Sequence, residues 1–231
     1  MLERWRFDRG LRAAARSDEA VLRNYAAADW VSLDTPVTEA NLLALDFELD
    51  GLGRGAHLLQ VGWVPFRAGG IALGDAFVSD IRSTAELDRK AITIHGIGND
   101  RAQAGESVRS VITNLLRALS GRVLVAHGAT IETEAMAATC RKLFSIAPPV
   151  RAICTLLLER HLSPGLVGGE AYRLGPTRAR YGLPEYRAHD ALGDALAAAE
   201  LLLAQLTRLD PDIALKSIMK KARGERWPLS Y

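Results

Sequence analysis

The stretch LLALDFELDGLG, residues 42 to 53, restricts the fold more than any other part of this chain. Its Leu and Ala residues are typical of a buried strand, but Asp46 and Glu48 interrupt them two residues apart. Alternate residues of a strand point to the same face, so both carboxylates project side by side, just before Gly51 and Gly53 begin a turn. Charges are rarely buried unless they are paired or bind a metal. The strand therefore needs either arginine partners at an exposed edge or a cation.

Length and composition fit one globular domain with an extension. The chain has 231 residues, is 48% hydrophobic and carries a formal net charge of +2, which favours no particular partner. Its two cysteines, Cys140 and Cys154, have no CxxC spacing, which excludes a zinc ribbon and fits a reducing compartment. No apolar run reaches the roughly 18 residues of a membrane-spanning helix, and no secretory signal is visible. We expect a soluble, cytoplasmic protein.

The order of the apolar patterns predicts an α/β fold with a mixed sheet. Three strand-like runs separated by Gly-rich turns indicate an antiparallel meander, and helices alternate with two further strands after it. The expected strands are 42–48, 56–66, 70–81, 122–126 and 151–155, and the expected helices are 106–121, 133–144 and 186–206.

Three segments are expected along the chain. Residues 1–40 read as an N-terminal helical extension, whose Arg-rich face is interpreted as solvated surface. Residues 41–207 form the main domain, and residues 208–231 form a basic C-terminal tail.

Further candidate ligands and bases occur in two later segments. His189 and Asp194 lie five residues apart, on what we predict to be the long Ala/Leu helix. An Asp on such a helix is hard to explain without a cation. Glu132 and Glu134 open a helix after His127, where acids also favour the helix dipole, and the apolar register favours Glu132 over Glu134 as a ligand.

Four ordered motifs resemble the DEDDh, or DnaQ-like, 3′–5′ exonucleases, the group that includes the proofreading subunit of bacterial replicative DNA polymerase. They are ALDFELDGL (44–52), the IHGI element in ITIHGIGND (92–100), VAHGATIE (125–132) and HDALGD (189–194). RYGLP (180–184) also resembles the loop that often precedes the last motif. The resemblance covers about residues 41–207 and implies an RNase H-like mixed five-stranded sheet flanked by helices.

The resemblance also implies a site with two Mg²⁺ or Mn²⁺ ions that hydrolyses phosphodiester bonds. Asp46 would be the ligand shared by both ions, Glu48 and Asp194 would hold the ion next to the attacking water, and Glu132 would serve the second ion. His189 would be the general base. The same resemblance assigns Leu49, His95 and Ile97 to substrate binding. By their residue type, Tyr181, Arg178 and Arg180 are assigned to base stacking and phosphate contacts. His127 is expected to be a hydrogen-bonded structural residue, and Phe47 to belong to the core.

The expected function is metal-dependent 3′–5′ exonuclease activity on single-stranded DNA or RNA ends, with release of nucleoside monophosphates and a possible polymerase partner. A ribonuclease or oligoribonuclease activity is an alternative, because no motif distinguishes DNA from RNA. A second alternative is a degenerate nuclease that binds a polymerase or another partner. It is motivated by Leu49-Asp50, where relatives have Thr-Thr, by Gly128 in place of Asn, and by Glu132 in place of Asp.

Overall fold

The structure is a computed structural model that describes residues 2–51, 57–83 and 97–222. Within these ranges, an N-terminal helical pair is followed by four consecutive strands, and helices then surround two further strands. The strands are β1 (Leu42–Leu49), β2 (Leu58–Arg67), β3 (Gly70–Ile71), β4 (Phe77–Asp80), β5 (Val123–Ala126) and β6 (Ala152–Cys154). The helices are α1 (Leu2–Ala15), α2 (Ala20–Ala26), α4 (Asn99–Ala104), α5 (Val108–Leu119), α6 (Ala129–Phe144), α7 (Thr155–Leu162), α8 (Leu174–Arg180), α9 (Ala191–Leu206) and α10 (Leu215–Lys221).

The strands form one mixed sheet with β1 in its interior. The strand order is β3-β2-β1-β5-β6, and β4 also pairs with β2. β1 and β2 are antiparallel, whereas β1, β5 and β6 are parallel to one another. Helix α6 connects β5 to β6, as parallel neighbours require a crossover. The fold class predicted from the sequence is therefore confirmed.

The predicted third strand, residues 70–81, is divided in the structure, which gives six strands where five were expected. β3 pairs with Phe66 and Arg67, and β4 pairs with Gln60 to Trp63. Val64 and Pro65 lie between these two ladders. Pro65 has no amide hydrogen to donate, so the ladder is interrupted there, and the chain leaves the sheet through a short 3₁₀ turn at Leu73–Asp75.

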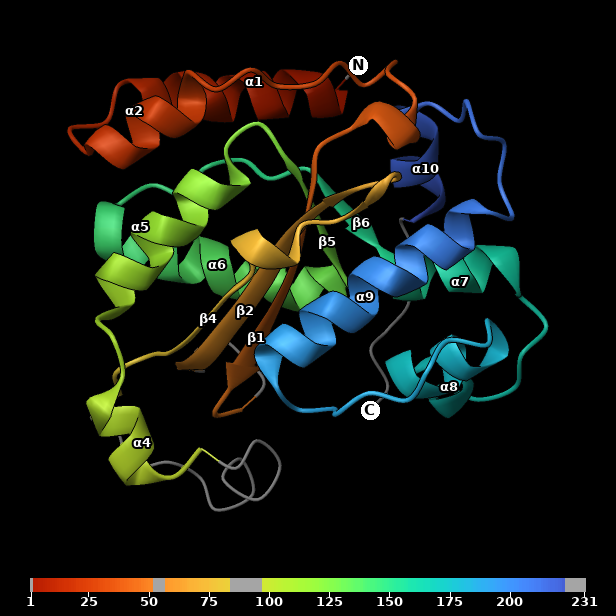
Figure 1. Ribbon diagram of the computed structural model, residues 1–231. Coiled ribbons are helices and arrows are strands. Elements are labelled where there is room, and N and C mark those ends of the chain that lie inside the picture. Colours follow the sequence, from red (N-terminus) through yellow and green to blue (C-terminus); the bar gives the residue numbers. More distant parts are fainter. Residues whose placement is uncertain (1, 52–56, 84–96, 223–231) are drawn as a thin grey trace.

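The two faces of β1 bury different side chains, as the alternation of a strand requires. Leu43, Leu45 and Phe47 lie in the core beneath α1, α2, α5 and α6. Leu42 and Ala44 lie in a second core that α9 and α10 cover. Figure 1 shows α9 crossing the sheet on this side. Phe47 is 5% exposed and is a core residue, as predicted.

Candidate active site

Three carboxylates from two distant elements converge at the carboxyl end of β1. Asp46 and Glu48 belong to β1, and Asp194 belongs to the first turn of α9. One ligand oxygen from each lies within 4.8 Å of the others. Glu48 is buried, and Asp46 and Asp194 are partly buried. Oxygen donors at this spacing match what hard divalent cations such as Mg²⁺ and Mn²⁺ prefer.

Gly62 allows α9 to approach the sheet at this point. It pairs with Asp46 across β1 and β2, and a Cβ atom on Gly62 would lie 2.2 Å from the amide nitrogen of Leu192. No side chain fits in that space. The sequence did contain a signal for it, because an isolated Gly inside an apolar strand often marks a close backbone approach.

Gln60 fixes the start of α9 to β2. It pairs with Glu48 across the two strands, and its side-chain oxygen accepts a hydrogen bond of 3.0 Å from the amide of Ala191. Its side-chain nitrogen donates to Asp80 at 2.8 Å. Gln60 is 3% exposed, so these bonds are shielded from water. Nothing in the spacing of the motifs indicated this residue.

Asp194 is oriented by one hydrogen bond to each carboxylate oxygen. The Tyr186 hydroxyl donates to Oδ1 at 3.0 Å, and the backbone amide of His189 donates to Oδ2 at 2.7 Å. Burial and the nearby Asp194 carboxylate raise the pKa of Tyr186, so its hydroxyl keeps its proton and remains a donor. Sequence reasoning missed Tyr186, since it lies eight residues before Asp194 in an irregular segment.

His189 does not lie on the long helix, which corrects the prediction made from the sequence. α9 begins at Ala191, and Asp190 is its N-cap, whose carboxylate accepts a hydrogen bond from the amide of Gly193. His189 precedes the cap with a backbone φ of 63°, in the left-handed region, and is exposed. The capping preference of Asp explains why the helix starts later than the apolar pattern suggested.

Glu132 lies in the first turn of α6 and is 4% exposed, whereas Glu134 is exposed. Burial raises the pKa of Glu132 to about 8. In the described part of the chain, its Oε2 atom is buried without a hydrogen-bond partner. A buried carboxylate oxygen without a partner is costly, and a cation or its hydrating water would satisfy it.

The pKa of Asp46 lies well above the ordinary range of an aspartate. Its pKa is raised first by burial, and then by the charges of Glu132, Asp194 and Glu48. Burial also raises the pKa of Asp194, although its hydrogen bonds from Tyr186 and His189 oppose the effect. Acids that raise one another's pKa in this way form a site that a divalent cation would stabilise.

The predicted substrate-binding residues have different positions. Leu49 is partly buried at the end of β1, where the pairing with β2 shifts register after Glu48. Ile97 is buried against Leu59 and Ala102. His95 lies outside the described residues. Their contacts with substrate remain predictions.

His127 forms hydrogen bonds away from the acidic cluster. Its Nε2 lies 2.8 Å from the carbonyl oxygen of Tyr172, and its Nδ1 lies 2.9 Å from the Thr155 hydroxyl. Burial lowers the pKa of His127 to about 4, so the ring is neutral, donates from Nε2 to the carbonyl and accepts at Nδ1. The structural role expected for this residue is confirmed.

Arg178 is not available for phosphate contacts, which corrects a second expectation. It is 2% exposed, forms an ion pair of 2.7 Å with Glu200 and donates to the carbonyl oxygen of Ala197. The Tyr181 hydroxyl and Arg180 are engaged as well, since both donate to the buried carboxylate of Glu159. These side chains hold α8 against its neighbours.

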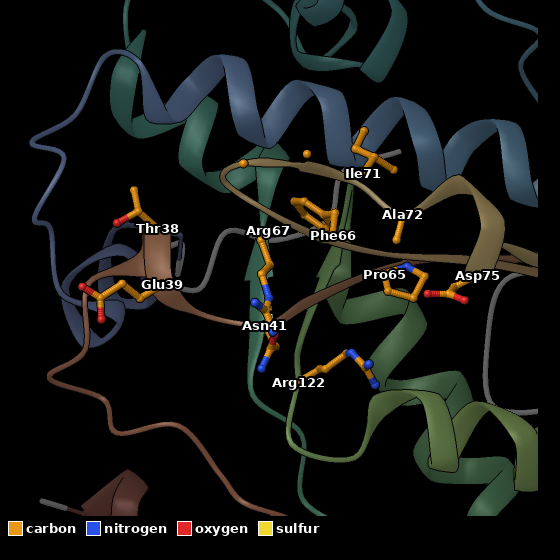
Figure 2. A pocket seen from close by; sticks show the side chains of 12 residues that line it. Thr38, Glu39, Asn41, Pro65, Phe66, Arg67, Ile71, Ala72, Asp75 and Arg122 are labelled. Atoms are coloured by element: carbon orange, nitrogen blue, oxygen red, sulfur yellow. Dashed lines mark hydrogen bonds between the residues drawn. The ribbon is translucent and has the colours of Figure 1, made fainter.

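A separate cavity of about 730 Å³ lies at the other end of β1. Figure 2 shows Asn41, just before β1, among the side chains that line it, together with Arg67 and Arg122. Arg67 is partly engaged, since its Nε donates to Asn41. None of the acidic residues of the cluster lines this cavity.

The chain has a mixed α/β sheet that gathers acids at the carboxyl end of an interior strand. Residues 43–202 match the family model described as Exonuclease (RNase_T), and the chain belongs to this family. The match confirms the family inferred from the four motifs.

Two curated relatives are similar over most of the chain. The PolC-type DNA polymerase III of Thermotoga maritima is 28% identical over 196 residues, which are 84% of this chain but 14% of that protein. The DNA polymerase III subunit epsilon-like protein of Rhodobacter capsulatus is 26% identical over 182 residues, 76% of this chain and 25% of that protein. The chain thus spans a small part of each relative.

Solved structures share the fold at low sequence identity. Exonuclease X in complex with 5′ overhanging duplex DNA has a TM-score of 0.61 and 20% identity, and the match covers 79% of this chain and 99% of that one. The nuclease domain of 3′hExo, a DEDDh family member bound to rAMP, has a TM-score of 0.63 and 15% identity over 75% of this chain and 95% of that one.

Among the residues described here, no helix has the length and apolar character needed to cross a bilayer.

Proposed function

We propose that this chain is a metal-dependent 3′–5′ exonuclease that removes nucleoside monophosphates from single-stranded nucleic acid ends. The observation that carries the proposal is the convergence of Asp46, Glu48 and Asp194, with ligand oxygens within 4.8 Å of one another. The orphaned oxygen of Glu132, whose charge also raises the pKa of Asp46, supports a site built for cations.

The residues fit a pair of Mg²⁺ or Mn²⁺ ions. Asp46 would be the shared ligand, Glu48 and Asp194 would hold one ion, and Glu132 would serve the other through water. When bound, such ions make a water molecule acidic and neutralise charge on the phosphate and the leaving oxygen. Gly62 and Gln60 hold the two halves of the ligand set together by fixing α9 to β2.

His189 is the proposed general base. Its backbone amide is bonded to Asp194, so its imidazole is tethered at the rim of the acidic cluster, and the side chain is exposed to solvent. Imidazole is the side chain that most often serves as a general base. The water loses a proton to the ring, its oxygen forms a bond to phosphorus, the bond from phosphorus to the 3′-oxygen of the preceding nucleotide breaks, and that oxygen takes up a proton from solvent.

The test is digestion of a labelled single strand in Mg²⁺, Mn²⁺ or EDTA, with DNA, RNA and dinucleotides compared in parallel. We expect cation-dependent release of mononucleotides and a loss of roughly 10³-fold or more in turnover for Asp46→Asn. Glu132→Gln should also lose activity, whereas the matched control Glu134→Gln, on the exposed side of the same helix, should keep it.

Each other outcome identifies a different function. Selective digestion of RNA or of dinucleotides would indicate the ribonuclease or oligoribonuclease alternative. A folded chain that neither binds Mn²⁺ nor cleaves any strand would indicate a degenerate nuclease that binds a partner. A polymerase partner is proposed because both of these curated relatives are DNA polymerase III proteins. A cytoplasmic location remains a prediction.

A further inference from the structure

The outward face of α1, together with Arg16 directly after its end, carries one aromatic and three cationic side chains in a row. Trp5, Arg9, Arg12 and Arg16 follow one another at intervals of four, three and four residues, and such positions share one face of a helix. All four are exposed, and half of the Trp5 side-chain surface is open to solvent. We call these four residues the α1 ridge. From Trp5 to Arg16 it spans about 16 Å at about 1.5 Å per residue.

The opposite face of α1 is fixed to the domain. Phe7 is buried, its ring contacts Trp30 edge-to-face at 5.1 Å, and the guanidinium of Arg151 lies over it at 4.2 Å. Gly10 lies against Pro149, so closely that a Cβ atom would be 2.8 Å away. The ridge is therefore held on a rigid support, and the apolar face of α1 is not available to a lipid surface.

The arginines of the ridge have no carboxylate partners in the described part of the chain. By contrast, Arg101 and Arg109 form ion pairs with acids at the surface. The guanidinium of Arg9 lies 5.3 Å from the centre of the Trp5 ring, and this contact is compatible with a second partner on the free face of either group. Three aligned cations, none of them in an ion pair within the described residues, form a positive strip.

We propose that the α1 ridge binds the phosphate backbone of nucleic acid, with Trp5 stacking on a base. Arginine guanidinium groups bind phosphate oxygens in pairs, and tryptophan provides a stacking surface that tolerates every base. The length of the ridge corresponds to the rise of roughly five nucleotides at about 3.4 Å each. The combination of exposed arginines and an exposed tryptophan fits nucleic acid better than an acidic protein surface.

The ridge lies far from the acidic cluster. Phe7 contacts Arg151, which immediately precedes β6, so α1 lies at the amino end of the parallel strands, whereas Asp46 and Glu48 lie at the carboxyl end of β1 (Figure 1). Along β1, Asp46 and Glu48 lie four and six residues beyond Leu42, which is about 13 and 20 Å at about 3.3 Å per residue. The ridge therefore holds a distant part of a long strand. This inference rests on the proposed function in one respect: it takes the nucleic acid bound by the ridge to be the substrate of the acidic cluster.

The experiment measures binding of the full chain to fluorescent single-stranded DNA of about thirty nucleotides, by anisotropy in EDTA, so that it needs no turnover. The variant replaces Arg9, Arg12 and Arg16 with Gln. We expect affinity to fall at least tenfold, and the slope of log affinity against log salt to decrease by about 2, since each phosphate contact on a single strand contributes about 0.7. Trp5→Ala should weaken binding severalfold without changing the slope.

The control variant removes three exposed cations elsewhere, Arg117, Arg141 and Lys142, none of which has an acidic partner within the described residues. Equal losses in the two triple variants, or unchanged affinity in the ridge variant, would overturn the proposal. So would competition by polyglutamate as strong as that by DNA, which would identify an acidic protein partner. Digestion of strands of about four nucleotides should be the same in the ridge variant and the wild type, so loss of nuclease activity reports separately on the acidic cluster.

Discussion

Two hydrogen bonds, one to each carboxylate oxygen, orient the side chain of Asp194. Tyr186→Phe removes the donor to Oδ1 and leaves the backbone donor to Oδ2 in place. Because partners of metal ligands orient them, we expect Mn²⁺ affinity and turnover to fall by roughly 10–100-fold. Calorimetric titration with Mn²⁺ measures the affinity, and circular dichroism checks that the fold is intact.

Tyr181→Phe is a matched control for this change. It also removes a hydroxyl that donates to a carboxylate, the buried one of Glu159, but at a place outside the acidic cluster. It should lower the free energy of unfolding by about 1 kcal/mol and leave Mn²⁺ affinity unchanged. If Tyr186→Phe behaved like this control, Tyr186 would be a stability residue and not one that positions Asp194.

At the scale of elements, α9 packs closely on β2 because Gly62 has no side chain. Gly62→Ala would place a methyl group 2.2 Å from the backbone of Leu192, and backbone at a helix start cannot move without displacing Asp194. We expect unfolding free energy to fall by about 1–3 kcal/mol and turnover to fall with it. Chemical denaturation and the digestion assay measure the two effects.

Gly74→Ala provides the comparison, because a Cβ atom there has no neighbour within 4 Å. This variant should retain both stability and activity. Full activity in Gly62→Ala would show that the start of α9 tolerates displacement, and that the close approach of helix and sheet does not set the ligand geometry.

The elements also show what the sequence could predict. The alternation in β1 and the Ala/Leu pattern of α9 identified both elements and the acids on them. The start of α9 was misplaced because hydrophobic periodicity continues past a capping Asp, so His189 was assigned to a helix that begins after it. Residues 70–81 are divided into β3 and β4 because Pro65 on the neighbouring strand β2 has no amide hydrogen to donate. The pattern within residues 70–81 contains no information about a group that is missing from the partner strand.

Sequence reasoning did not find two of the hydrogen bonds that position the site. The hydrogen bond from Ala191 to Gln60 and the bond from Tyr186 to Asp194 join residues that no motif relates. Arg178 illustrates the opposite error, because a cation near a motif was assigned to phosphate when it is buried against Glu200. Residue types predict what chemistry is possible, but burial decides which groups are available for it.

The whole molecule should respond to pH through its acidic cluster. In the metal-free protein, burial raises the pKa of Asp46, Glu132 and Asp194 above the ordinary value of about 4, and the charges of neighbouring acids add to this for Asp46 and Asp194. Between the ordinary and the raised pKa, the folded state binds more protons than the unfolded state, so stability falls as pH rises. We expect the free energy of unfolding in EDTA to fall by a few kcal/mol between about pH 5 and pH 8.

Divalent cations should reverse this loss, because they bind the same carboxylates once these are deprotonated. At pH 8, Mn²⁺ at about 100 times its dissociation constant should add about 2.7 kcal/mol, and it should add less at pH 5. Replacing Asp46 with Asn and Glu132 with Gln should flatten the pH dependence in EDTA and abolish the response to Mn²⁺. If that double variant kept the wild-type slope, the acids that set the pH dependence would lie elsewhere, and the cluster would not be the place where cation binding stabilises the fold.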